Sequence, residues 1–150
     1  MKFTCTKTNF NNGINIALKA VPGKTTMPIL ECVVIEAKGD MVKLTTNDMQ
    51  LGIETKIPAE IEQDGIILVN AKMISEIVRR LPDDDVNFEV DENNNILLFC
   101  GKSKFNIPGI PHDEFPMLPK IEADKTIHIS QFTLKAVSYT HLTLPTNSLV

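Results

Sequence analysis

The stretch KAVPGKTTMPIL, residues 19–30, marks the point where the chain changes from a helical pattern to a strand pattern. Over about residues 8–21, apolar side chains recur every three or four residues, which is typical of a helix packed on a core. Pro22 and Gly23 then end this helix, because proline lacks an amide hydrogen and glycine accepts the backbone conformation of a helix terminus. The sequence that follows carries the signals of strands.

Two helices are predicted from the spacing of apolar residues. The first begins near Thr8 or Asn9, because either side chain can accept a hydrogen bond from a free amide of the first turn. The second spans about residues 71–81, with Asn70 as its cap and Pro82 as its stop.

Short apolar runs separated by turn residues predict strands on both sides of the second helix. Adjacent strands with only two helices indicate an α+β domain, in which an antiparallel sheet carries both helices on one face. The expected strands are residues 1–6, 29–38, 41–46, 50–57, 65–70, 85–90, 95–100 and 103–107.

Composition fits one compact cytoplasmic domain. A chain of 150 residues that is 43% hydrophobic can bury a sizeable core. No apolar run approaches the roughly 18 residues of a membrane span, and the start lacks the apolar segment of a signal peptide. The histidines lack zinc-ligand spacing, so we expect no metal and no cofactor. We expect buried, reduced thiols at Cys5, Cys32 and Cys100.

The charges are unevenly distributed. The formal net charge is −4, yet the first thirty residues contain four lysines and no aspartate or glutamate. Both predicted helices have an uncharged or basic outer face, whereas acidic residues collect in turns such as residues 83–85. On the second helix, Glu76 and Arg80 have the spacing of an i, i+4 ion pair.

The beginning of the chain is partly repeated near its end. KFTCTKTNFNNGINIALKAV, residues 2–21, and KTIHISQFTLKAV, residues 125–137, share a lysine, an alternating strand, a phenylalanine and an LKAV segment. Such a repeat predicts the start of a second copy of the domain. From residue 138, SYTHLTLPTNSLV has neither a helical period nor a set of strands, so we expect a poorly packed tail.

A series of motifs resembles one family along most of the chain. KTTMPIL, LTTND, RRLP, SKFNIPGIP and DEFPMLP, in this order and spacing, resemble the bacterial sliding clamps, the β subunits of DNA polymerase III holoenzyme. The resemblance implies a non-catalytic processivity factor, a ring of two subunits with three similar domains each, around duplex DNA. It assigns residues 1–124 to the first domain and residues 125–137 to the start of the second. Residues 138–150 do not match, and we interpret them as an artefact of a gene fragment.

The resemblance also explains the distribution of charge. In this family helices line the hole and sheets form the outside, so helix faces without acidic residues would meet phosphates. Lys24 aligns with a basic position at which clamps contact DNA. We expect the cations to project from one side of the domain and the turn at residues 83–85 to leave that side clear. The expected DNA-contacting residues are Lys19, Lys24, Lys72, Arg79 and Arg80.

A homodimer is implied likewise, in which the first domain of one subunit meets the third domain of the other. The contact involves the second helix and an adjoining edge strand, and without a partner we expect Met73, Phe105 and Ile107 to be exposed. The positions concerned are Met73, Ile77, Phe105 and Ile107. Plain core packing is an alternative, above all for Ile77. The polymerase and the clamp loader would bind domains beyond this chain.

The sequence also bears on two other functional classes. An enzyme is disfavoured, because the sequence contains no nucleophile elbow, phosphate-binding glycine loop or pair of catalytic carboxylates, and we assign no catalytic residue. A non-clamp α+β protein-interaction module is the alternative to a clamp. An exposed edge strand at residues 103–107 with no clamp-like partner would favour it.

Overall fold

The computed structural model describes the backbone of residues 1–122 and 124–147, and the side chains of residues 1–122 and 124–139. The chain divides into two compact units, Met1–Leu118 and Pro119–Val150.

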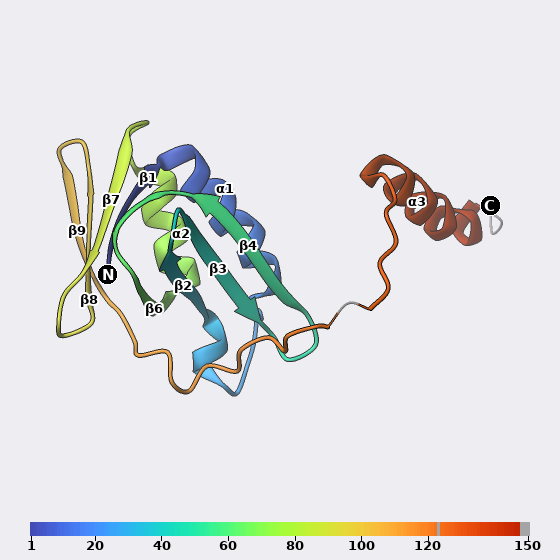
Figure 1. The fold of residues 1–150 in the computed structure, drawn as a ribbon. Coiled ribbons are helices and arrows are strands. Elements are labelled where there is room, and N and C mark those ends of the chain that lie inside the picture. Colours follow the sequence, from blue (N-terminus) through green and yellow to red (C-terminus); the bar gives the residue numbers. More distant parts are fainter. Residues whose placement is uncertain (123, 148–150) are drawn as a thin grey trace. The chain divides into compact units, whose positions relative to one another are not determined.

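The first unit is an α+β domain (Figure 1), as predicted. Its strands form two antiparallel sheets, one of five strands in the order β5-β1-β7-β8-β9 and one of four in the order β4-β3-β2-β6. The sequence predicted a single sheet and missed the short strand β5. The elements are β1 (Lys2–Thr6), α1 (Lys7–Ala17), two 3₁₀ turns (Leu18–Ala20 and Pro28–Glu31), β2 (Cys32–Lys38), β3 (Met41–Asn47), β4 (Gly52–Pro58), β5 (Glu60–Gln63), β6 (Gly65–Asn70), α2 (Ala71–Arg80), β7 (Asp85–Val90), β8 (Asn95–Cys100) and β9 (Ser103–Pro108).

The two sheets arise from two similar halves that exchange strands. One half is β1-α1-β2-β3-β4 and the other is β6-α2-β7-β8-β9. The first strand of each half pairs with the other half: β1 pairs with β7, and β6 pairs with β2. The two halves are therefore related by pseudo-twofold symmetry. Each half needs the first strand of the other half to complete its sheet.

Both helices pack on the four-stranded sheet and on each other (Figure 1). α1 contacts β3 and β4, whereas α2 contacts β2 and β6. Phe10 of α1 also reaches the five-stranded sheet. There Phe3 and Phe88 are stacked with 4.8 Å between ring centroids, and Phe10 meets both rings edge-on. All three rings are fully buried, so this cluster fixes α1 between the two sheets.

The helix starts have clear local causes. Thr6 caps α1, because its hydroxyl accepts a hydrogen bond from the Asn9 amide at 3.2 Å. The predicted caps at Thr8 and Asn9 are wrong, since β1 runs directly into the helix. The predicted cap of α2 is confirmed, because the Asn70 side chain accepts from the Met73 amide at 3.0 Å.

Gly13 lets α1 lie close to the four-stranded sheet. A Cβ atom at this position would be 2.8 Å from Ile57 Cγ2 and 2.9 Å from Leu44 Cδ1. Such contacts are too close without movement of two buried side chains. Gly13 lowers the intrinsic stability of α1, but it allows α1 to pack closely against the four-stranded sheet, and this packing stabilises the helix.

We expect Gly13→Ala to destabilise the protein although alanine favours helices. Overpacking costs about 1–3 kcal/mol, which outweighs a propensity gain of about 1 kcal/mol. Urea unfolding measures the difference, and Asn12→Ala, at an exposed position of the same helix, is the control. A Gly13→Ala variant as stable as Asn12→Ala would show that the close packing is not required.

A strap of residues 110–118 crosses the outer face of the four-stranded sheet and is drawn in orange in Figure 1. It begins with two backbone hydrogen bonds between Ile110 and Leu68 of β6. Phe115 is 5% exposed and packs in a small cluster with Leu68 and two residues of β2. Asn47 of β3 then donates a hydrogen bond to the Pro116 carbonyl at 2.8 Å. The DEFPMLP motif therefore ties the end of the domain across its sheet.

Phe115→Ala should lower the free energy of unfolding by about 3 kcal/mol, because it empties a buried aromatic site. Met117→Ala removes a side chain of the same strap that is 44% exposed, and should have little effect. Hydrogen exchange at the Ile110 and Leu68 amides should accelerate in Phe115→Ala alone. Equal stability of the two variants would contradict the anchoring role.

The second unit contains α3 (Gln131–Asn147), which Ser130 caps through a 3.0 Å hydrogen bond from the Thr133 amide. The sequence from residue 138 lacks a helical period of apolar residues, yet α3 continues to Asn147, because backbone hydrogen bonds can continue a helix without an apolar stripe. Residues 148–150 lie outside the described part. Several apolar side chains of this unit are largely exposed, among them Ile127 and Phe132.

The cysteines are buried and reduced, as predicted. Burial raises the pKa of the Cys5 thiol to about 12 and also raises the pKa values of Cys32 and Cys100. No helix among the described residues is long and apolar enough to cross a membrane.

Candidate nucleic-acid interface

The two helices form an antiparallel pair. The amide of Lys7, at the start of α1, donates to the Asp84 carbonyl, just after the end of α2, at 3.2 Å. At the other end, Asn70 before α2 pairs with Cys32, which follows the loop after α1. Each helix therefore begins where the other ends.

The five cations predicted from the sequence all belong to this helix pair or to the loop after α1, and all are exposed. Within the described part of the chain, none of them forms an ion pair. The antiparallel arrangement divides them between two ends. Lys19 and Lys24 follow α1 and lie towards Lys72 at the start of α2, whereas Arg79 and Arg80 lie at the opposite end.

The local structure holds these cations in place. Thr46 of the LTTND motif is fully buried, and its hydroxyl donates to the Ala17 carbonyl at 2.6 Å, which fixes the end of α1 just before Lys19. In the next loop, the Thr25 hydroxyl accepts from the Met27 amide at 3.0 Å. At the end of α2, two arginines suit the negative end of the helix dipole.

The acidic turn at residues 83–85 differs from the expectation. Its three aspartates and the threonines Thr6 and Thr8 line a hollow of about 470 Å³ at the start of α1. It therefore shares one end of the helix pair with Arg79 and Arg80, instead of leaving the cations clear. The cause is topological, since β7 must start beside Thr6 in order to pair with β1.

The predicted ion pair within α2 is also not formed. Both residues are exposed, and the structure, which describes both side chains, gives no contact within 4.0 Å between Glu76 and Arg80. Solvated pairs of this kind contribute only a few tenths of a kcal/mol, about 0.3–0.5. Each charge is thus free to act on its surroundings.

The positions expected at a dimer interface differ in exposure. Met73 is 43% exposed, and Ile77 and Phe105 are half-buried against the core. Ile107 is 1% exposed, so the expectation of an exposed side chain there is wrong. β9 is an edge strand, as predicted. An edge strand leaves its backbone hydrogen-bonding groups unpaired on one side, but its side chains still point to the two faces of the sheet. The side chain of Ile107 points to the core face, where Ile107 pairs with Ile96. Ile107 could therefore contribute to an interface only through the backbone of β9, and not through its side chain.

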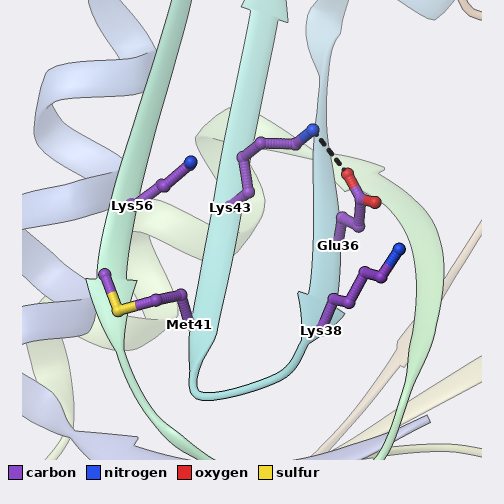
Figure 2. Close-up of a pocket in the computed structure, with 5 residues that line it drawn as sticks. All are labelled: Glu36, Lys38, Met41, Lys43 and Lys56. Atoms are coloured by element: carbon purple, nitrogen blue, oxygen red, sulfur yellow. Dashed lines mark ion pairs between the residues drawn. The ribbon is translucent and has the colours of Figure 1, made fainter.

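A different charged surface lies on the outer face of the four-stranded sheet (Figure 2). Glu36, Lys38, Met41, Lys43 and Lys56 line a hollow of about 260 Å³. Lys43 Nζ lies 2.7 Å from a Glu36 carboxylate oxygen, and this hydrogen bond raises the pKa of Lys43. Lys38 and Lys56 form no ion pair with any described residue. Because strand residues alternate, this surface faces away from the helices.

The family follows from comparison with known proteins. The family model "DNA polymerase III beta subunit, N-terminal domain" matches residues 1–119. The chain belongs to this family. The beta sliding clamp of Bacillus subtilis is 39% identical over 143 residues, which cover 90% of this chain and 38% of the relative. That of Staphylococcus epidermidis is 33% identical over 145 residues, with 91% and 38% covered.

Solved structures agree with the family assignment. A DNA polymerase III beta subunit from Eubacterium rectale has 51% identity and a TM-score of 0.87, over 91% of this chain and 38% of that chain. The sliding clamp of Bacillus subtilis has 38% identity and the same TM-score and coverage. The chain thus spans 38% of the length of these beta subunits.

Sequence reasoning assigned no role to Thr46 and Gly13, which position α1, or to Phe115, which anchors the strap on the outer sheet face. Thr46 and Phe115 stand in the quoted family motifs LTTND and DEFPMLP, so these motifs were the available signal. For Gly13, the sequence indicated only that glycine is unfavourable inside a helix.

Proposed function

We propose that this chain is the N-terminal part of a DNA sliding clamp, a processivity factor for the replicative DNA polymerase III. The whole protein would be a cytoplasmic homodimeric ring around double-stranded DNA, without catalysis or a cofactor. The observation that carries this proposal is the antiparallel helix pair, whose five exposed cations have no ion-pair partner among the described residues of an acidic chain.

The physical requirements of a clamp suit this arrangement. Contacts to phosphates do not depend on sequence, so they permit movement along the duplex, whereas base contacts would hold the ring at one site. Retention would come from the closed ring, so a few cations suffice. The overall negative charge is compatible, because only the local field at the lining acts on DNA.

The rest of the ring would build on the same fold. We assign residues 1–124 to the first domain and residues 125–137 to the start of the second. Residues 138–150 we assign to neither domain, because they lack the family pattern. The third domain of a second subunit would contact Met73, Ile77 and Phe105. It would also contact the open backbone edge of β9 at Ile107. Polymerase and clamp loader would bind elsewhere on the ring.

The alternative, a non-clamp interaction module, would use another surface. The outer sheet face offers unpaired lysines at Lys38 and Lys56, beside the Lys43–Glu36 pair (Figure 2). Glu36 and Glu54 balance part of this charge. Duplex DNA should therefore prefer the helix pair.

Lys24→Ala should weaken binding of this chain to a labelled duplex and reduce the salt slope of log K by about one. Lys38→Ala, at an exposed lysine on the outer sheet face, is the control and should leave binding unchanged. Fluorescence anisotropy over a range of salt concentrations measures both. Stability should stay within about 0.5 kcal/mol in each variant, because both lysines are exposed. Equal DNA binding by the two variants would contradict the proposed lining.

A further inference from the structure

Glu76 has an unusual position for an acidic residue in a proposed DNA-binding surface. It lies in the middle of α2, four residues after Lys72 and four before Arg80, so the three side chains form one row on the helix. All three are exposed, and the described residues include no ion-pair partner for Glu76. Its negative charge therefore remains available on the outer face of the helix.

The pseudo-twofold relation of the halves shows that this charge is not required by the fold. The helix starts give the offset between the halves, because Thr6, the cap of α1, corresponds to Asn70, the cap of α2, 64 residues later. With this offset, the buried residues of the two helices also correspond: Phe10 to Ile74, Ile14 to Val78, and Ala17 to Leu81. Glu76 then corresponds to Asn12, which is exposed as well. The same place in the fold thus carries a neutral amide on one helix and a carboxylate on the other.

We propose that Glu76 limits the attraction between the helix pair and DNA. The inference rests on the proposed function and adds a residue that sets the strength of the contact. A carboxylate between Lys72 and Arg80 repels the phosphates that these cations attract, so it subtracts from their combined effect. A weaker contact shortens the time that the duplex spends at one position, which favours sliding. On α1, Asn15 stands four residues before Lys19, as Glu76 does before Arg80, and its neutral amide leaves the attraction of Lys19 undiminished.

The test uses two reciprocal, nearly isosteric variants of the 150-residue chain. Glu76→Gln removes the charge from α2, and Asn15→Asp adds one at an exposed position of α1, four residues before Lys19. Glu92→Gln is the control for net charge, because Glu92 is exposed in the turn between β7 and β8. Binding to a labelled duplex is measured by anisotropy at about 50 mM and about 200 mM salt. Circular dichroism melting verifies that each variant is folded.

Glu76→Gln should bind about two- to five-fold more tightly at the lower salt concentration, and the gain should shrink at the higher one. Asn15→Asp should bind more weakly by a similar factor, and Glu92→Gln should bind as the unchanged chain does. If Glu76→Gln behaves like Glu92→Gln while Lys24→Ala still weakens binding, the inference about Glu76 is wrong and the proposed lining stands. If neither Lys24→Ala nor Glu76→Gln changes binding, the proposed lining and the inference both fail.

Discussion

The pairing of β1 with β7 constrains the rest of the first unit. It joins the beginning of the chain to a strand that starts after α2, so the two halves cannot form separate sheets. Because β1 runs directly into α1, the pairing also places the start of α1 beside the end of α2. Phe3, Phe10 and Phe88 fill the space at this junction. The antiparallel helix pair is a consequence of strand exchange.

This constraint determines where charges can lie. Because the two helices are antiparallel, the cations at the C-terminus of α1 and those at the C-terminus of α2 lie at opposite ends of the pair. The same pairing brings the aspartates of residues 83–85 next to the start of α1. The surface that we propose for DNA is therefore not uniformly basic. It has two basic ends, of which one lies beside an acidic turn, with Asn15 and Glu76 between them. Such a surface suits weak attraction better than tight binding.

The sequence allowed the prediction of features that depend on local patterns. The order of the elements, the cap at Asn70 and the exposure of the five cations follow from periodicity, capping and charge. Features that depend on distant partners were missed. Periodicity does not state which strand β1 pairs with, so the second sheet was not foreseen. Ile107 was misjudged for a similar reason, because an edge strand still has a face that points to the core.

The contact between DNA and the helix pair can be tested directly by nuclear magnetic resonance. The amide signals of the ¹⁵N-labelled chain would be followed while a short duplex is added at low salt. The account predicts that the largest shifts occur at both ends of the helix pair, around Lys19 and Lys24 and around Arg79 and Arg80. Shifts confined to the outer sheet face, around Lys38, Lys43 and Lys56, would contradict it.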